Sequence, residues 1–320
     1  MRLTHAEIQR EWDAALAGPR MHHGWILAGR QGLGKSEFAL DAARQLVARG
    51  ATAPQPDGEH PDIHLLSRPP KDDKEVRKRA EGKPFERKRN ISVDQIRAMQ
   101  RRLTTRPTLG RNRAIIIDPA DDLEKGASNA LLKSLEEPPV GTFFILVTHR
   151  LARLLPTIRS RCRVLRFNPL PDAQVEKLLK EESPSSDAAV REAAVAAAKG
   201  SPGAAIKFIE QDLAPLAAIM RDIVAQGDRA FELRGALSAA IGARPNRERV
   251  QATFDLARTI LAEQMATVPS AQLMQLADAH ADMVALAGQA PTYNFDPGFL
   301  AMEIGSLLAS AAPHTERANV

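Results

Sequence analysis

The sequence has little of three residue classes that mark common kinds of protein. It contains a single cysteine, Cys162, which excludes an internal disulfide and any metal site built from several cysteines. Aromatic residues make up 4% of the chain, too few for a surface on which the bases of a single strand would stack. The apolar runs are too short to cross a bilayer, and residues 1–7 show no signal-peptide pattern. We therefore expect a cytoplasmic protein, and its 320 residues, 44% of them hydrophobic, predict two or three domains.

A complete phosphate-loop motif, G-x-x-x-x-G-K-[ST], spans residues 29–36. In such loops glycines turn backbone N–H groups toward phosphate oxygens, a lysine reaches the β- and γ-phosphates, and a hydroxyl holds Mg²⁺. A short apolar run precedes the motif and a helical pattern follows it, which is the strand–loop–helix order that such a site requires. The sequence therefore predicts a site for ATP or ADP with Mg²⁺. The residues expected to form the loop are Gly29, Gly32, Gly34, Lys35 and Ser36.

The segment Ile115–Pro119 supplies a second part of the expected nucleotide site. Asp118 follows three isoleucines and is placed to act, with Ser36, on the metal side of the nucleotide. Hydrolysis also needs a group that orients or deprotonates the attacking water, and Pro119 can do neither. Asp121 and Asp122 come two and three residues later and are expected to point elsewhere. We therefore expect nucleotide binding with absent or weak hydrolysis.

Apolar runs and helical patterns alternate over the first half of the chain. This alternation predicts an α/β domain with a five-stranded parallel sheet covered on both faces. Its ligand site would lie at the carboxyl ends of the strands, where residues 29–36, Asp118 and Thr148 all fall. The expected strands are Trp25–Ala28, Asp62–Leu66, Ala114–Ile117, Phe143–Thr148 and Val164–Phe167, and the expected helices are Lys35–Arg49, Ser92–Leu103 and Ser128–Glu137.

From Pro169 on, the chain becomes alanine-rich and helical, with breaks at proline- and glycine-containing stretches. We expect a core domain over residues 1–168, a small helical domain over 169–210, an all-α domain over 211–312, and a flexible tail over 313–320.

Residues 68–90 form a strongly charged segment. They contain ten Lys/Arg and five Asp/Glu, a net charge of +5, with almost no apolar residues. Because such a segment cannot build a core, we expect a mobile loop. The segment has two open interpretations: a contact with DNA phosphates or an acidic partner surface, or a solvated insertion that keeps the protein in solution.

Three motifs, taken in order, carry a family resemblance. Residues 129–139, Asn-Ala-Leu-Leu-Lys-Ser-Leu-Glu-Glu-Pro-Pro, and residues 160–162, Ser-Arg-Cys, resemble the signature motifs of bacterial clamp-loader subunits. Residues 200–205, Gly-Ser-Pro-Gly-Ala-Ala, are closer to the delta-prime family than to the gamma/tau motor subunits. The resemblance implies an AAA+ core, a three-helix lid domain and a helical collar. It also implies a five-subunit ring with gamma/tau and delta subunits that loads a sliding clamp onto primed DNA.

The resemblance also assigns roles to individual residues. Arg161 matches the arginine finger that enters the ATP site of a neighbouring subunit, although the residues alone allow it to be one of several surface arginines. Thr148 matches the sensor position of the fourth strand, and Cys162 is expected to pack beneath its loop. Motor subunits have a glutamate at the position of Pro119 and a phosphate-clamping arginine at that of Gly203. The expected role is therefore a stator with Arg161 acting in trans.

Two other functions stay open at this point. An ATP-hydrolysing clamp-loader motor of the gamma/tau or replication-factor type is supported by the intact phosphate loop. A different phosphate-loop enzyme, such as a kinase or helicase, would leave residues 135–139 and 160–162 unexplained.

Many members of the resembled family carry a four-cysteine zinc module between the first helix and the second strand. Here residues 50–60 contain no cysteine, and His60 and His64 alone are too few for a structural zinc site. We expect no zinc.

Overall fold

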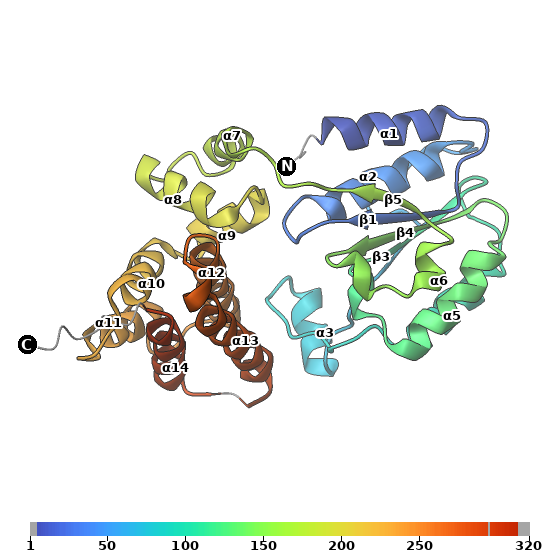
Figure 1. The fold of residues 1–320 in the computed structure, drawn as a ribbon. Coiled ribbons are helices and arrows are strands. Elements are labelled where there is room, and N and C mark those ends of the chain that lie inside the picture. The colour runs from blue at the N-terminus through green and yellow to red at the C-terminus, as the bar shows by residue number, and fades with distance from the viewer. Residues whose placement is uncertain (1–4, 294, 313–320) are drawn as a thin grey trace, which may run out of the picture. The chain divides into compact units, whose positions relative to one another are not determined.

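The computed structural model describes residues 5–293 and 295–312, and the chain divides into two compact units, Met1–Pro169 and Leu170–Val320. The first unit is the predicted α/β domain (Figure 1). Its strands are β1 (Gly24–Ala28), β2 (Ile63–Leu66), β3 (Arg113–Ile117), β4 (Thr142–Thr148) and β5 (Arg163–Arg166). Its helices are α1 (Ala6–Ala17), α2 (Lys35–Ala48), α3 (Asp73–Ala80), α4 (Val93–Leu103), η1 (Ala120–Asp122), α5 (Lys125–Glu136), η2 (Leu151–Arg153) and α6 (Pro156–Arg159).

The five strands form one parallel sheet in the order β2-β3-β4-β1-β5, which confirms the predicted fold class. Alternate residues of each strand face opposite sides, as the two-residue period of a strand requires. Trp25 and Ile116 lie in a cluster with α1 and α2, whereas Ile26 and Ile115 lie in a cluster with α4, α5 and α6. Figure 1 shows α1 and α2 on one side of the sheet and α5 and α6 on the other. Helices therefore pack on both faces of the sheet and hold its strands in place.

Helix α1 was not predicted from the sequence. It packs on the sheet through Trp12, whose ring is fully buried and makes an edge contact with Trp25 at 5.1 Å between ring centroids. The indole Nε1–H donates to Gln45 Oε1 on α2 at 2.7 Å. Burial of one large aromatic ring and satisfaction of its N–H group hold the helix in place.

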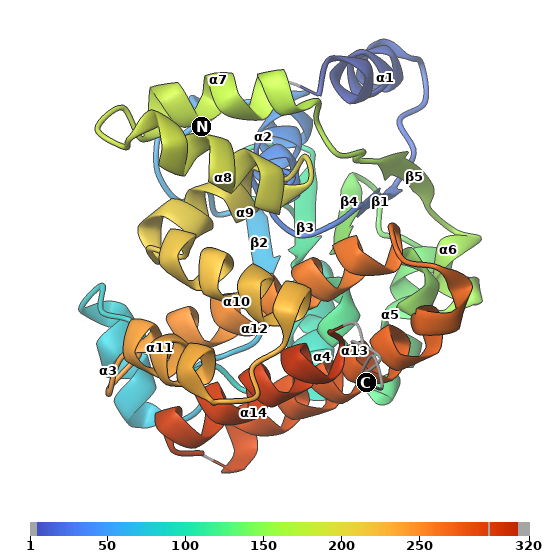
Figure 2. The ribbon, with the colours of Figure 1, turned by 60° about the vertical axis from the view of Figure 1, so that its left-hand side comes forward.

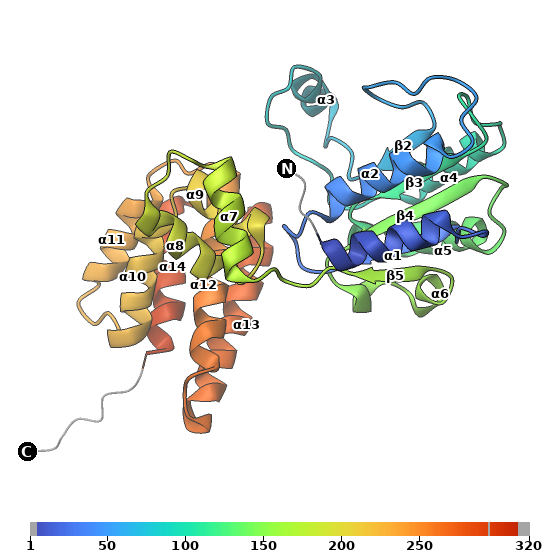
Figure 3. The ribbon, with the colours of Figure 1, turned by 90° about the horizontal axis from the view of Figure 1, so that it is seen from above.

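The charged segment 68–90, which we expected to be a mobile loop, contains a helix and internal hydrogen bonds. Residues 73–80 form helix α3, whose N-cap is Asp72, and backbone N–H groups of Lys71 and Lys88 pair with Glu86 and Pro69 across the segment. Glu75 is buried, and its carboxylate accepts from the Glu86 N–H at 2.6 Å and from Lys78 Nζ at 2.7 Å. Figure 3 shows α3 apart from the helices that cover the sheet. Polar contacts, rather than an apolar core, organise this segment.

The second unit is all helical, as predicted. Its helices are α7 (Asp172–Glu182), α8 (Ala188–Ala198), α9 (Pro202–Glu210), α10 (Ala214–Gln226), α11 (Glu232–Ile241), α12 (Arg247–Met265), α13 (Ser270–Tyr293) and α14 (Pro297–Ser310). Helices α7, α8 and α9 contact one another and form one group in Figure 2. The tail expected over residues 313–320 lies outside the described residues.

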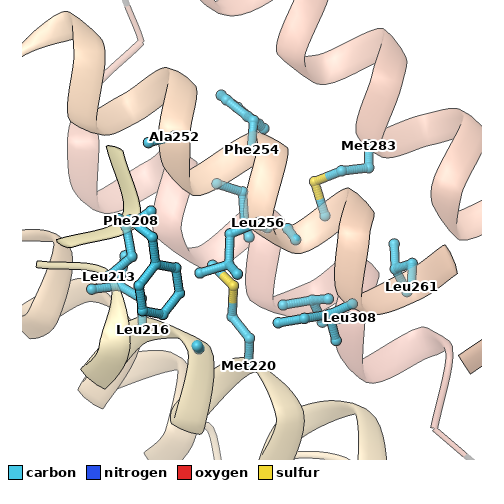
Figure 4. Close-up of a cluster of buried hydrophobic side chains, with 14 of the residues drawn as sticks. Phe208, Leu213, Leu216, Met220, Ala252, Phe254, Leu256, Leu261, Met283 and Leu308 are labelled. Carbon is cyan, nitrogen blue, oxygen red and sulfur yellow. The ribbon is translucent and has the colours of Figure 1, made fainter. Parts of the chain in front are cut away.

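One hydrophobic cluster runs through the whole second unit. Phe208 of α9 lies with Leu216 and Met220 of α10 and with Leu256 of α12 (Figure 4). The same cluster continues to Leu308 of α14. Residues from both expected helical domains, 169–210 and 211–312, therefore share a continuous core. None of the helices in the described residues is long and apolar enough to cross a membrane.

Candidate nucleotide site and arginine loop

The phosphate loop connects the carboxyl end of β1 to the first turn of α2. Gly32 and Gly34 have positive φ angles of 81° and 75°, a left-handed conformation that glycine adopts without strain. A Cβ atom on Gly29 would lie 2.4 Å from the Phe167 carbonyl oxygen, so only glycine fits between this loop and the end of β5. The loop therefore needs its glycines for reasons of backbone geometry, and it brings backbone N–H groups to the start of a helix.

Lys35 lies inside this loop. Its side chain is almost fully buried, with 3% of the residue exposed, and Nζ donates to the Arg30 carbonyl oxygen at 2.6 Å. Burial lowers the pKa of Lys35 to about 8, although the nearby charges of Asp118, Asp121 and Glu37 act in the opposite direction. A buried ammonium group at a helix start, close to carboxylates, is the arrangement expected for binding a phosphate with its metal ion.

Asp118 follows β3 at the carboxyl edge of the sheet. Its N–H donates to the Leu66 carbonyl oxygen at 2.9 Å, and its charge acts on Lys35. Ser36 is exposed in the first turn of α2. The hydroxyl and the carboxylate are the donor types that Mg²⁺ takes beside a nucleotide, so the residues present fit the predicted ligand.

The two acids after Pro119 are both engaged in structural contacts. Asp121 accepts from the N–H groups of His149 and Arg150 at 2.7 and 3.0 Å and so holds the chain that leaves β4. Asp122 pairs with Arg68 at 3.0 Å, and burial raises the pKa of its carboxyl group. Neither carboxylate is placed as the free base that Pro119 fails to supply, in agreement with the sequence argument.

Thr148 is the last residue of β4 and is fully buried beside β1, where it pairs in register with Ala28. Its hydroxyl oxygen accepts from the Arg150 N–H at 3.2 Å. The next residue, His149, was missed by the sequence analysis. Its Nδ1 atom is buried and has no hydrogen-bond partner among the described residues, and burial and Lys35 together lower its pKa. Its position directly after Thr148 was the one signal that could have identified it.

Arg161 lies at the amino ends of the strands, whereas the phosphate loop lies at their carboxyl ends. The strand β5 begins beside Trp25 and ends beside Ala28, so the loop before it is near the amino end of β1. The five residues of β1 span about 16 Å at roughly 3.3 Å per residue. The phosphate loop follows the other end of that strand. The Arg161 guanidinium therefore cannot serve the phosphate site of its own sheet.

The structure joins two motifs that the sequence analysis treated separately. Arg161 Nη2 lies 2.7 Å from Oε1 of Glu136, the last residue of α5, and Nη1 donates to the Thr157 carbonyl oxygen at 2.9 Å. The side chain of Arg161 remains 34% exposed. The next residue, Cys162, packs against Gly24, where an added Cβ would lie 2.9 Å from Sγ. Burial raises the pKa of the Cys162 thiol to about 12, as expected for a packing residue.

Two further positions bear on the expected ligands. Gly203 is the second residue of α9, so the position that we expect to match the clamping arginine of motor subunits has no side chain here. Both ring nitrogens of His60 are engaged, by Gln55 Oε1 and by the Asp62 N–H. Within residues 5–293 and 295–312 no three His, Cys, Asp or Glu side chains gather as a metal-binding cluster. The absence of zinc from the protein stays a prediction.

Comparisons with known proteins agree with these motifs. A family model described as "DNA polymerase III, delta subunit" matches residues 4–171, more than half of the chain. The DNA polymerase III subunit delta' of Pseudomonas aeruginosa is 35% identical over 197 residues, which cover 60% of this chain and 58% of that protein. The subunit delta' of Escherichia coli is 32% identical over 212 residues, covering 62% and 58%.

A gamma/tau subunit is also similar. The DNA polymerase III subunit gamma/tau of Mycobacterium bovis is 32% identical over 209 residues, covering 63% of this chain and 35% of that protein. The chain thus spans 58% of the length of the two delta' relatives that it matches. The family model covers every strand and helix of the α/β unit, and the expected resemblance to the delta' family is confirmed. The chain therefore belongs to the DNA polymerase III delta-subunit family.

Proposed function

We propose that this chain is a clamp-loader stator, which supplies Arg161 to the ATP site of a neighbouring subunit and spends little or no ATP of its own. It would act as a cytoplasmic protein in a five-subunit ring with gamma/tau motor subunits and a delta subunit. The assembled ring would open a sliding clamp and load it onto primed DNA. The helices of the second unit, within residues 211–312, would form the collar that holds the ring together.

The observation that carries this proposal is the position of Arg161. Because it lies at the amino edge of the sheet, with the phosphate loop at the carboxyl edge, the phosphate that it can reach belongs to another molecule. A guanidinium supplied in trans stabilises the charge of phosphoryl transfer and is worth about 10³–10⁵ in rate in other systems. Such a contribution requires an accessible arginine on a fixed loop: the Arg161 side chain is 34% exposed, and the adjacent Cys162 packs against Gly24.

The chain's own site supports nucleotide binding better than hydrolysis. Lys35, Ser36 and Asp118 fit a nucleotide with Mg²⁺, which would supply charge neutralisation on the phosphates when bound. Position 119 is a proline, and the acids that follow it hold other groups. Without a residue that orients water, and with Gly203 at the clamp position, turnover in cis lacks two of its usual contributors.

A motor function is the second candidate. The intact phosphate loop and the similarity to gamma/tau subunits favour it. An experiment on the isolated chain distinguishes the two candidates. ATP binding at equilibrium and ATP hydrolysis are both measured for wild type and for Lys35→Ala. The stator proposal predicts that wild type binds nucleotide and releases no phosphate above the Lys35→Ala background. Robust turnover by wild type, abolished in Lys35→Ala, contradicts the stator proposal in favour of a motor.

A further inference from the structure

The Arg161 guanidinium is held by groups from two elements. On its own side of the loop, Nη1 donates to the Thr157 carbonyl oxygen at 2.9 Å and to Ser160 Oγ at 3.3 Å. From α5, the Glu136 carboxylate takes the Nη2 group at 2.7 Å. These contacts use both Nη1 hydrogens and one Nη2 hydrogen. The Nε–H group and the other Nη2 hydrogen are left for a ligand.

Both partners of this ion pair are mounted on fixed backbone. The carbonyl oxygen of Leu135, next to Glu136, accepts a hydrogen bond from His23 Nε2 at 2.9 Å, which ties the end of α5 to the segment before β1. Cys162, next to Arg161, packs against Gly24, the first residue of β1. The backbone next to Glu136 and the backbone next to Arg161 are therefore both attached to the amino end of β1. The fold thus sets the distance between these two side chains.

We propose that Glu136 is a positioning residue for Arg161: its carboxylate fixes the guanidinium in the orientation that a neighbouring subunit's phosphate requires. An arginine side chain has large rotamer freedom, and holding it in advance removes an entropic cost from the transition state. A charged acceptor holds it more firmly than a neutral one. Because the Glu136 side chain is 48% exposed, solvent screening limits the effect to severalfold rather than thousandfold. This inference rests on the proposed action of Arg161 in trans.

The adjacent residue provides a matched control. Glu137 is also exposed and also belongs to residues 135–139, but the ion pair of Arg161 is with Glu136 and not with Glu137. Removing its charge changes the net charge of this segment by the same amount as removing that of Glu136, without loss of the ion pair. A specific effect of Glu136 must therefore be absent from Glu137→Ala.

The test is steady-state ATP hydrolysis by the complete complex, assembled with its motor and delta subunits on primed DNA with the clamp. We expect Glu136→Ala to lower kcat about three- to tenfold while the KM for ATP stays unchanged, because the neighbour's own phosphate loop binds the ATP. Glu136→Gln, whose amide oxygen still accepts from Nη2, should recover part of the loss, and Glu137→Ala should match wild type. In an Arg161→Ala background, Glu136→Ala should add nothing.

Three results overturn the inference. A Glu136→Ala complex as fast as wild type, or faster because the carboxylate had competed with phosphate, excludes a positioning role. An equal loss with and without Arg161 means that Glu136 acts through another group. If Arg161→Ala itself leaves hydrolysis unchanged, the proposed function fails together with the inference. If Arg161→Ala lowers hydrolysis but Glu136→Ala does not, only the inference fails. If the Glu136→Ala complex assembles poorly, the kcat of Glu136→Gln and of Glu136→Asp is compared with that of wild type instead.

Discussion

Replacing Gly24 by alanine should disturb the Arg161 loop without touching Arg161 itself. The new Cβ would lie 2.9 Å from Cys162 Sγ and 3.1 Å from the Arg161 carbonyl oxygen. Ordinary contacts between such atoms begin near 3.4 Å or more. The sulfur can rotate away, but the carbonyl is backbone, so residues 161 and 162 must shift by several tenths of an ångström.

The cost of this shift can be bounded from the behaviour of packed cores. Inserting one extra methyl group into a close-packed site costs about 1–3 kcal/mol. For a domain of this size, each kcal/mol lowers Tm by about 2–4 °C, so the melting transition of the first unit should fall by roughly 2–12 °C. Because a displacement of about 1 Å at a reacting group can cost on the order of 100-fold, a shift of a few tenths should lower trans-activated ATP hydrolysis by about tenfold.

Differential scanning calorimetry of the isolated chain and ATP hydrolysis by the assembled complex provide the two readouts. Gly24→Ala combined with Cys162→Ala removes the sulfur contact and should recover part of both losses. Gly235→Ala is the matched control, because nothing lies within 4 Å of the added Cβ and the residue is inside helix α11. That variant should be neutral or more stable by up to about 1 kcal/mol.

The reasoning is refuted if Gly24→Ala melts with wild-type Tm and retains full ATP hydrolysis in the complex. It is also refuted if the double variant is no better than Gly24→Ala, since the clash with Sγ would then have no part in the effect.

Four further predictions follow from the buried groups. Lys35 loses its charge as pH rises through its pKa of about 8, so nucleotide affinity should fall about tenfold between pH 7 and 9 in a binding titration, whereas Lys35→Arg should stay flat. Between pH 8 and the unfolded pKa of 10.5, Lys35 binds more protons in the unfolded chain than in the folded one, so its contribution to the free energy of unfolding rises with pH. In urea titrations at several pH values, a Lys35→Met variant should lack this rise. Cys162, with its pKa raised to about 12, should resist alkylation at pH 8 until the protein is unfolded, and fast native labelling would contradict its packing role. Phe254→Ala, at a fully buried position, should destabilise the second unit by about 3–5 kcal/mol in calorimetry, and a change below 1 kcal/mol would contradict the core assignment.

Local patterns predicted most of the sheet and little of what surrounds it. The five strands were predicted to within one residue at every end, because buried parallel strands appear as short apolar runs. Helix α1 was missed, since its burial depends on Trp12 packing against Trp25 rather than on a strong apolar stripe. Helix α3 was missed for a related reason: it is organised by the buried carboxylate of Glu75, and a contact of that kind leaves no periodic signal.

The candidate site divides in the same way. The phosphate loop could be predicted from the sequence because all of its residues are adjacent and each has a chemical reason for its type. The placement of Arg161 at the far edge of the sheet required the strand order and register, and its pairing with Glu136 joins positions 25 residues apart. His149 lay beside a predicted residue, but only the fold shows that its Nδ1 is buried near Lys35.

The most direct test of the central claim compares two single substitutions, and one control substitution, in the same assembled complex. We predict that Arg161→Ala abolishes ATP hydrolysis at the adjacent subunit, by about a thousandfold in single-turnover measurements, whereas Lys35→Ala and the exposed control Arg166→Ala leave hydrolysis nearly unchanged. The opposite result, a large loss from Lys35→Ala with wild-type turnover in Arg161→Ala, would contradict the account and place the hydrolysed ATP in this chain's own site.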